Sequence, residues 1–457
     1  MQRATVTSAN NDKIVAGTWS GKLQAPEHIP EQADVVVIGG GIVGVSTAWF
    51  LARQGVDVAL CEKGFIAGEQ SGRNWGWIRQ QGRDPRELPM MIESNRIFSE
   101  LEDEIGENIG FAKGGCLFTA NSEKDMESFH GWLETARDFE LDTHVIGATE
   151  LSELIDGATP NWYGAMYTPS DARAEPHKTT PAIARAASRA GATILTSCAV
   201  RGIDSAAGRV SAVITEHGSI RTSVVLCAAG AWTSMFCRSL GIAVPQLKVR
   251  GPVARTAPCE KVMDGNLFDD RIGIRRREDG GYTVAHGSVL DHGITPSTFR
   301  YALKFLPALM QELKVLRIRF GKDFIEELSM PSRWALDQPS PFEQMRVLNP
   351  APSRSVLKGI RRNLYEVFPR LAGVELVESW AGMVETSPDV VPMIGEVGDV
   401  TGFHIATGFS GHGFGIGPGA GKALAAMLTG DDNPIDLAPF RLSRFFDGTP
   451  IRPQTTI

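Results

Sequence analysis

The sequence predicts an α/β fold, in which a Rossmann-like dinucleotide-binding domain is interrupted by an α+β domain built on an antiparallel sheet. The first observation is an apolar strand followed at once by spaced glycines, at 35–44. The second is a pair of later apolar segments, at 224–232 and 403–415, that also run into small residues. The third is the stretch 245–379, where apolar and polar residues alternate between turns.

The first strand carries the dinucleotide-binding motif. Val35–Ile38 is a run of four apolar residues, typical of a strand buried on both faces of a parallel sheet. A helix from Ile42 to Gln54 and a strand from Val56 to Leu60 are expected next, with Glu62 placed to accept a ribose hydroxyl. The alternative, a glycine-rich turn in an ordinary α/β protein with Glu62 on the surface, leaves this context unexplained. The glycines that fit G-x-G-x-x-G allow a tight turn, approach of a pyrophosphate and close helix packing, and they are Gly39, Gly41 and Gly44.

Composition excludes several classes of protein. The 457 residues have room for two or three domains, and 42% hydrophobic with 22% charged residues is typical of a globular protein. A net charge of -7 without a long basic run argues against a nucleic-acid partner. No window approaches 18 uninterrupted apolar residues, so no membrane span is expected. Residues 1–33 are polar and lack the apolar core of a secretion signal, which predicts an N-terminal extension and a cytoplasmic location.

The cysteines and histidines show no metal-ligand spacing. No C-x-x-C pair occurs, and several cysteines sit in strand-like apolar runs, so we expect buried free thiols in a reducing compartment and no metal. The six cysteines are Cys61, Cys116, Cys198, Cys227, Cys237 and Cys259.

The segment Gly64–Arg83 is too rich in glycine and polar residues for a regular element, yet it holds Trp75 and Trp77. Such a loop is either a surface excursion or a wall for a flat ligand. The elements expected after it are a helix at Met90–Ile105, a short strand at Gly114–Thr119 and a helix at Ser122–Phe139.

From about residue 175 the α/β pattern returns. A buried strand that begins at Val224 runs into small residues up to Trp232, which allows close approach of a flat group or a phosphate, although a simple strand-to-helix turn explains it as well. The elements expected before it are a helix at Pro181–Ala190, a strand at Ala192–Leu195 and a strand at Arg209–Glu216.

The stretch 245–379 predicts an antiparallel sheet with helices on it. Arg271–Ser288 is the clearest hairpin, with its turn at Glu278–Gly281, and Tyr301–Phe320 is expected to form one long amphipathic helix. The resulting domain prediction is an extension at 1–33, a first domain formed by 34–83, 176–244 and 380–457, and a second domain formed by 84–175 and 245–379.

The last motif is the glycine-rich segment Phe403–Gly415. A strand that runs through glycines into a helix N-terminus offers a second site for partial negative charge. The helix is expected at Lys422–Leu428, preceded by Gly417, Gly419 and Gly421.

Taken together, these motifs resemble the D-amino acid oxidase-like flavoproteins, a family that includes sarcosine oxidases, glycine oxidase and D-amino acid dehydrogenases. The resemblance covers about 34–430 and rests on the order of its motifs rather than on any one of them. Besides the first strand and its glycines, they are Ser71-Gly72-Arg73-Asn74, Cys227–Trp232, Trp380-Ala381-Gly382, Thr386-Ser387-Pro388-Asp389, Pro392–Gly395 and Gly408–Phe414.

The resemblance implies FAD as the cofactor, held in a Rossmann-like FAD-binding domain with an inserted substrate domain. It places the first glycines at the pyrophosphate, Glu62 at the adenosine ribose, Val200 near the adenine and 411–417 at the pyrimidine end of the flavin. No cysteine stands near Gly382, where monomeric sarcosine oxidases attach flavin covalently, so noncovalent FAD is expected. The cofactor-binding residues implied are Gly39, Gly41, Ile42, Val43, Gly44, Glu62, Lys63, Ser71, Arg73, Asn74, Trp75, Val200, Ala229, Gly230, Trp232, Gly382, Gly411, His412, Gly413, Gly415 and Ile416.

The activity implied is oxidation of a C–N bond in a D-amino acid or an N-substituted amino acid, with hydride transfer to flavin and hydrolysis of the imine. Relatives place a lysine for the substrate carboxylate where this chain has Gly415, and a lysine that helps oxygen react where it has Tyr282. These departures favour a dehydrogenase over an oxidase. The electron acceptor is accordingly oxygen, a quinone or a partner protein.

Three residues are predicted to contact substrate. His412 lies between glycines at the flavin end, and His286 ends the hairpin strand that faces the flavin in relatives; the alternatives are a backbone-fixing histidine and a satisfied strand histidine. Arg275, at a position where relatives often carry Arg, is expected to share a strand face with Arg277 and can grip a carboxylate, unless the run is simply solvated. Further candidates are Arg79 and Arg250 for an acidic group, and Trp75 and Trp77 for a cation–π wall or core packing.

Two other functional classes remain open from the sequence. A flavin-carrying subunit of a larger electron-transfer or dehydrogenase complex suits the polar N-terminal extension. A nicotinamide-dependent dehydrogenase would use the first motif alone, and the C-terminal glycine segment argues against it. The chain is also a possible oligomer.

Overall fold

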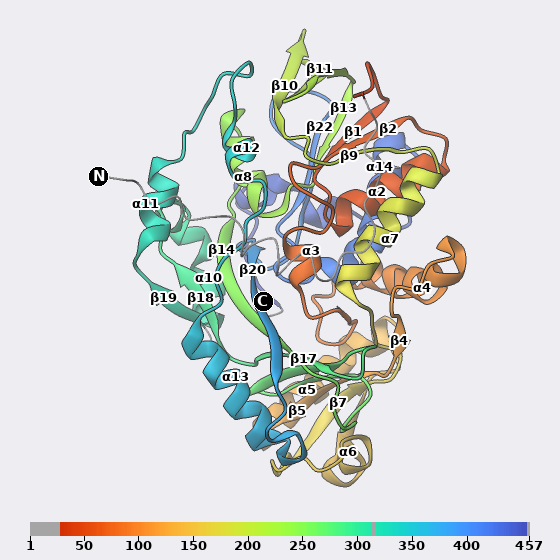
Figure 1. Cartoon of the computed structure of the whole chain (residues 1–457), viewed down its shortest axis with the longest axis vertical. Coiled ribbons are helices and arrows are strands. Elements are labelled where there is room, and N and C mark those ends of the chain that lie inside the picture. The colour runs from red at the N-terminus through yellow and green to blue at the C-terminus, as the bar shows by residue number, and fades with distance from the viewer. Residues whose placement is uncertain (1–27, 313–315, 455–457) are drawn as a thin grey trace.

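The computed structural model describes residues 28–312 and 316–454. Two large sheets dominate it, one in the upper half of Figure 1 and one in the lower half. The predicted extension 1–33 lies outside the described residues except for its last six, in which Gln32 forms a bridge with Arg221.

The upper sheet has six strands in the order β21-β22-β13-β1-β2-β9. Neighbouring strands run parallel except for the edge pair β21–β22. Ile38 lies between Cys61 and Cys227, so three strands end together at one edge of the sheet. Every residue of β1 and β2 is buried, as expected for central strands covered by helices on both faces. The strands are β1 (Val35–Ile38), β2 (Val58–Cys61), β9 (Thr193–Leu195), β13 (Val224–Cys227), β21 (Met393–Glu396) and β22 (Phe403–Thr407).

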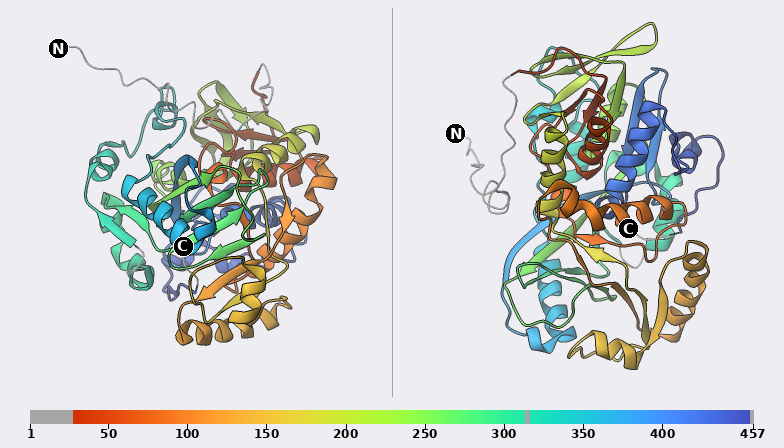
Figure 2. Two further views of the ribbon diagram at one scale, coloured as in Figure 1. Left: turned by 60° about the horizontal axis from the view of Figure 1, so that its bottom comes forward. Right: turned by 90° about the vertical axis from the view of Figure 1, so that its right-hand side faces the viewer.

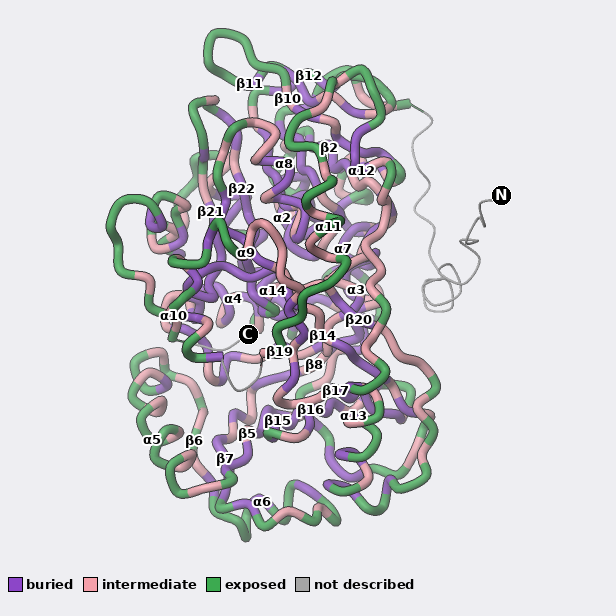
Figure 3. The backbone as a smooth tube through the Cα atoms, turned by 90° about the vertical axis from the view of Figure 1, so that its left-hand side faces the viewer, coloured by how far each residue is buried: buried purple, intermediate pink, exposed green. Residues whose placement is uncertain are grey.

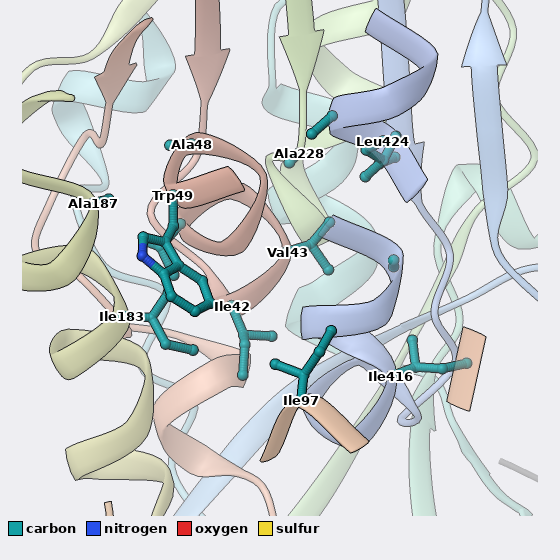
Figure 4. Packing of buried hydrophobic residues seen from close by; sticks show 14 of the residues in the cluster. Ile42, Val43, Ala48, Trp49, Ile97, Ile183, Ala187, Ala228, Ile416 and Leu424 are labelled. Carbon is teal, nitrogen blue, oxygen red and sulfur yellow. The ribbon is translucent and has the colours of Figure 1, made fainter. Parts of the chain in front are cut away.

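Four helices form a core against this sheet. Figure 4 shows Ile42, Val43 and Trp49 of the first helix among Ile97, Ile183 and Ile416 of its neighbours. In Figure 3 the same helices and strands form the buried interior of the upper half. The helices are α2 (Ile42–Arg53), α4 (Leu88–Ile105), α7 (Pro176–Arg189) and α14 (Gly413–Thr429).

The helix predicted at Lys422–Leu428 begins nine residues earlier, at Gly413. The prediction that Gly417, Gly419 and Gly421 precede the helix is therefore wrong, because these glycines are helical and buried. A Cβ on Gly419 would lie 2.1 Å from the Met90 carbonyl oxygen of α4, and one on Gly421 would lie 2.5 Å from Ser46 Cβ of α2. The glycines serve close helix packing, which outweighs their poor helix propensity.

The lower sheet has the strand order β19-β18-β14-β17-β16-β15-β5-β7-β6, and β20 also pairs with β14. Its pairs are antiparallel, as predicted, except for the parallel pairs β15–β5 and β18–β19. The hairpin predicted at Arg271–Ser288 is confirmed as β16 and β17. The strands are β5 (Cys116–Ala120), β6 (His144–Gly147), β7 (Gly164–Thr168), β14 (Leu247–Thr256), β15 (Asn266–Phe268), β16 (Ile272–Arg276), β17 (Tyr282–His286), β18 (Leu290–Gly293), β19 (Leu316–Arg319) and β20 (Leu376–Thr386).

Helices cover this second sheet. Ile360 and Leu364 of α13 pack on Ile274, Tyr282 and Val284 of the hairpin. Figure 2 (right) shows α13 on one side of the lower sheet and the α5–α6 region on the other. The helices are α5 (Glu123–Asp138), which confirms the prediction at Ser122–Phe139, α6 (Ala148–Leu154) and α13 (Arg354–Val367).

The long helix predicted at Tyr301–Phe320 is wrong in its second half. Helix α10 covers Ala302–Glu312, whereas Leu316–Arg319 is strand β19 at the edge of the lower sheet. The sequence Leu-Arg-Ile-Arg alternates with period 2 and pairs with the open edge of β18, so sheet hydrogen bonding outweighs the helical pattern.

The remaining elements are short. One small three-stranded sheet consists of β10 (Val200–Ala206), β11 (Arg209–Thr215) and β12 (Gly218–Arg221), and another of β3 (Trp77–Ile78), β8 (Ala172–Arg173) and β4 (Ala112–Lys113). The short helices are α3 (Gln70–Arg73), α8 (Thr233–Ser239), α9 (Pro296–Arg300), α11 (Lys322–Ser329) and α12 (Pro341–Gln344). Turns of 3₁₀ helix lie at Gly230–Trp232, Pro369–Leu371, Ala438–Phe440 and Leu442–Phe445.

Two glycine substitutions test the packing of α14. Gly419→Ala should lower the melting temperature, because its Cβ would meet the Met90 carbonyl at 2.1 Å and overpacking costs about 1–3 kcal/mol. Gly131→Ala is the matched control, since Gly131 lies in α5 with nothing within 4 Å of a new Cβ. It should be neutral or stabilising by about 0.5–1 kcal/mol through helix propensity. Thermal melts followed by circular dichroism measure both, and equal effects would contradict the packing role.

Candidate active site

The site begins where β1 turns into α2. Gly39 has φ +114°, and a Cβ there would lie 2.5 Å from the Ala228 carbonyl oxygen of the next strand. Gly44 would place its Cβ 2.1 Å from the Gly39 oxygen, so α2 rests directly on the turn. Ser71 Oγ accepts a hydrogen bond of 2.9 Å from the Ile42 amide in the first turn of α2. The N-terminus of a buried helix and a turn without side chains form a place for phosphate groups.

Glu62 follows β2 and stands beside this turn. Its two carboxylate oxygens accept hydrogen bonds from the Gly40 and Gly64 amides, both at 2.7 Å. Burial raises the pKa of the Glu62 carboxyl, against the opposing effect of Lys63 and the two amides. The chain therefore orients an acceptor group at the end of the second parallel strand, where the sequence predicted it.

The loop predicted at Gly64–Arg83 contains α3 and β3 and forms one wall of a cavity. Arg73 is 6% exposed and donates from Nε to the Gly68 carbonyl and from Nη1 to Asn349 Oδ1. Its Nη2 is buried and has no hydrogen-bond partner among the described residues. Asn74 Oδ1 accepts from the Gly76 amide at 2.7 Å, which fixes the bend that follows α3.

One continuous cavity of about 320 Å³ runs from the glycine turn to the lower sheet. It is lined by almost every residue that the resemblance implied for the cofactor; Gly44 and Ile416 lie behind the lining and pack the helices. The predicted residues that line it are Gly39, Gly41, Ile42, Val43, Glu62, Lys63, Ser71, Arg73, Asn74, Trp75, Val200, Ala229, Gly230, Trp232, Gly382, Gly411, His412, Gly413, Gly415 and also His286.

His412 is the N-cap residue of α14 and is 3% exposed. Its Nδ1 lies 3.0 Å from Glu87 Oε2, and Glu87 is fully buried at the start of α4. Burial lowers the pKa of His412, and the Arg83 guanidinium lowers it further. The ring is therefore neutral at neutral pH, held by Glu87 at the edge of the cavity.

His286 lines the cavity from the lower sheet, at the end of β17. Its Nδ1 accepts a hydrogen bond of 3.1 Å from the Ser288 amide, and Asn363 Nδ2 lies 3.4 Å from Nε2. Burial lowers the pKa of His286, and Arg317 and Arg362 lower it further. A neutral imidazole thus faces the cavity opposite the glycine turn.

Arg275 does not line the cavity. It is 1% exposed, and its two terminal nitrogens donate to the two oxygens of Glu175 at 2.9 and 3.1 Å. Arg277 approaches the same carboxylate at 3.5 Å, so the predicted shared face of these two arginines is confirmed. Burial alone would raise the pKa of the Glu175 carboxyl, but the two guanidiniums outweigh it and lower that pKa. Within the described residues, the Arg275 guanidinium is already committed to an internal carboxylate.

Two other residues named from the sequence also face away from the cavity. Tyr282 is fully buried, and its hydroxyl accepts from the Val262 amide at 2.8 Å. The presence of tyrosine at position 282, where relatives carry a lysine, is therefore no evidence on how a flavin in the cavity reacts with oxygen. Arg250 lies 3.5 Å from Asp323 and does not line the cavity, whereas Arg79 does.

Several cavity residues were missed by the sequence analysis. Gln70 and Glu385 form a hydrogen bond across the cavity wall, and Phe118 and Phe268 pair at 5.3 Å on the lower sheet. Arg83 was visible as a charge at the end of the glycine-rich loop, but only the fold shows that it points inward. The aromatic pair joins β5 to β15, whose paired residues are 150 apart in sequence, so no local pattern predicts it.

The cysteines are free, as predicted: five are buried and Cys259 is half-buried. No group of three or more His, Cys, Asp or Glu in 28–312 and 316–454 is placed to hold a metal ion. Across those same residues no helix is both long and apolar enough to cross a bilayer.

Comparison with known proteins decides the family. The model of the FAD dependent oxidoreductase family matches residues 34–427. The chain belongs to this family. The resemblance inferred from the sequence is thus confirmed, and FAD is the cofactor.

Individual relatives agree with this assignment. The mitochondrial sarcosine dehydrogenase of Mus musculus is 26% identical over 92% of this chain and 42% of its own length. Sarcosine oxidase subunit beta of Rhodobacter capsulatus is 24% identical over 94% of this chain and 92% of its own length. The chain spans about half the length of the mitochondrial relatives.

Among solved structures, L-amino acid deaminase from Proteus myxofaciens in complex with anthranilate superposes with a TM-score of 0.90. It is 32% identical, and the match covers 93% of this chain and 96% of that one. The predicted α/β architecture with a Rossmann-like FAD-binding domain is therefore confirmed at the level of the whole chain.

The residues present fit FAD. Side chains are excluded at the turn where a Cβ on Gly39 or Gly44 would meet main-chain oxygen, and Arg73 presents a buried nitrogen that lacks a partner among the described residues. Bound FAD would supply the acceptor for a hydride, which carries the two electrons of the oxidation. The chain's own groups, Glu62, Ser71, Arg73 and Asn74, would hold and orient it.

Flavin content tests the cradle. Gly39→Ala should lower the flavin absorbance per protein strongly, because the new Cβ would lie 2.5 Å from the Ala228 oxygen at a φ of +114° that alanine rarely adopts. Gly147→Ala is the control, since nothing lies within 4 Å of its Cβ. A folded Gly39→Ala protein, by circular dichroism, with the parent's flavin content would contradict this assignment.

Proposed function

We propose that the protein is an FAD-dependent oxidoreductase that oxidises the C–N bond of an amino acid or N-substituted amino acid. The observation that carries the proposal is the continuous cavity, which joins the glycine turn of the upper sheet to an aromatic and histidine-lined end on the lower sheet. Such a cavity suits a cofactor at one end and a small amine at the other. The names of its relatives, sarcosine dehydrogenase and L-amino acid deaminase among them, support the substrate class.

The chain's residues would bind and position the amine rather than supply a strong base. His286 and His412 both have a lowered pKa and face the cavity as neutral rings. An apolar, partly enclosed pocket disfavours the ammonium form of the substrate, so the uncharged amine is stabilised there. The electron acceptor is oxygen, a quinone or a partner protein. A cytoplasmic location is part of the proposal and is supported by the six unpaired cysteines.

Reduction of the bound flavin tests this function. Under anaerobic conditions, one compound from a panel of amino acids, N-methyl amino acids and secondary amines should bleach the absorbance band of oxidised flavin. Admission of air then separates an oxidase, which recolours at once, from a dehydrogenase, which stays bleached. A yellow protein that none of these compounds bleaches would contradict the proposal.

A second candidate function, as the flavin-carrying subunit of a larger complex, is favoured by an exposed apolar face. Helices α10 and α11 and strand β19 lie at the left of Figure 1. Leu303 of α10 is 88% exposed, and Phe320, directly after β19, is 73% exposed. Apolar patches of this kind mark interaction surfaces. The similar sarcosine oxidase chain is itself named as a subunit. The apolar face consists of Phe299, Leu303, Leu306, Met310, Ile318, Phe320, Ile325 and Leu328.

Light scattering after size exclusion, on protein purified from its native cells, tests this candidate. A complex should elute above the 49.4 kDa of one chain and fall to that mass in the double variant Leu303→Glu with Phe320→Glu. The matched control is Tyr163→Glu with Val377→Glu, since both residues are exposed outside the apolar face. A parent protein that elutes as a single chain would exclude the subunit role.

A further inference from the structure

The lower end of the cavity contains a buried guanidinium without a carboxylate partner. Arg83 lines the cavity and is 3% exposed, and its Nη1 has no hydrogen-bond partner among the described residues. Its Nε donates to the Arg79 carbonyl at 2.9 Å, which fixes the direction of the side chain. Two other buried arginines, Arg275 and Arg444, each grip a carboxylate with two nitrogens. Arg73 at the glycine-turn end is like Arg83 in that Nη2 lacks a partner among the described residues.

The carboxylates around Arg83 are oriented toward other groups. Glu87 binds His412 through Oε2 and leaves its buried Oε1 without a partner among the described residues, and Asp171 accepts the Gln80 and Gln81 amides. Within the described residues, neither lies within 4 Å of a nitrogen of Arg79 or Arg83. Burial, with Arg79 nearby, lowers the pKa of Arg83 to about 9, so it keeps its charge at neutral pH. A buried charge of this kind is stabilised when an anion reaches it.

A second cation and a helix end reinforce the positive potential at this place. Arg79 also lines the cavity and stacks over Phe118, with 5.1 Å from its guanidinium carbon to the ring centroid. Both arginines lower the pKa of His412, the N-cap residue of α14, so they lie near the positive end of that helix. Beside them, Phe118 and Phe268 present an apolar wall.

We propose that Arg83, assisted by Arg79, anchors the carboxylate of an amino-acid substrate, whose bulky apolar group lies against Phe118 and Phe268. This inference rests on the proposed function and specifies its substrate class. A guanidinium can hold a carboxylate with two parallel hydrogen bonds, and this fixes the orientation of the amine. The anchor lies in the loop before α4. It replaces the lysine that relatives carry at the position of Gly415, and it is needed because Arg275 is already paired with Glu175.

Binding of an aromatic carboxylate to the flavin-loaded protein tests the anchor without turnover. Benzoate should shift the flavin absorbance spectrum, and it should bind much more tightly than its uncharged isostere benzamide. Arg83→Met should weaken benzoate binding by about 10- to 100-fold, the usual effect of losing a charged hydrogen bond, and leave benzamide unchanged. Arg83→Lys should restore part of the affinity, and Arg79→Met should give a smaller loss. Arg189→Met, an exposed arginine on α7 paired with Glu107, is the control for lost charge.

Kinetics with matched amines separate this anchor from a structural role. For a carboxylate-bearing substrate, Arg83→Met should raise KM far more than it lowers kcat, and an amine without a carboxylate should be unaffected. Equal benzoate affinity in the parent, Arg83→Met and Arg79→Met would overturn the anchor. Because benzoate binding needs no reaction, a protein that binds benzoate through Arg83 yet oxidises no amine would leave the anchor standing and reject the proposed function.

Discussion

The structure depends on the close approach of the α2 backbone to the end of β1 on one side and to α14 on the other. Gly39 and Gly44 let the helix rest on the end of β1, where any Cβ would meet a carbonyl oxygen at 2.1–2.5 Å. On its other side, Gly421 of α14 meets Ser46, while Gly419 brings the same helix against α4. Helices α2 and α14 both begin at the cavity, and their N-termini supply positive potential there.

This packing also connects the two ends of the cavity. Helix α14 begins at Gly413, and Glu87 at the start of α4 holds its N-cap residue His412 in place. The helix then runs alongside α2, with Gly417 against Ile42 and Gly421 against Ser46. The same loop that supplies Ser71 and Arg73 at the cofactor end continues to Arg79 and Arg83 at the far end. A shift of α14 would therefore disturb both cofactor and substrate contacts, because the groups that form them share one packed unit.

Much of the upper half could be predicted from sequence because its signals are local. The strand Val35–Ile38, the glycines after it and Glu62 follow one another within a single strand–helix–strand unit, and the structure has them as expected. Where prediction failed, a tertiary contact outweighed a local pattern. The glycines of α14 are poor helix formers that were expected in a loop, and only their contacts with α2 and α4 explain a helix there.

The residues at the lower-sheet end of the cavity were harder to predict from the sequence, again because tertiary contacts decide their roles. Arg275 appeared available as a cation, but Glu175, a hundred residues earlier, occupies it. Arg83 was named only as the end of the glycine-rich segment Gly64–Arg83, yet the fold buries it. Charge pairing between distant segments decides which arginine is free, and spacing along the chain does not report it.

A deuterium isotope effect tests the central claim, that substrate is oxidised at the carbon bearing the amine inside this cavity. Flavin reduction in a single anaerobic turnover would be followed by stopped flow, with the best substrate carrying either hydrogen or deuterium at that carbon. The account predicts several-fold slower bleaching with deuterium, with no change in the affinity for benzoate. Equal rates for the two isotopes, at saturating substrate and with reduction as the observed step, would contradict hydride transfer from that carbon.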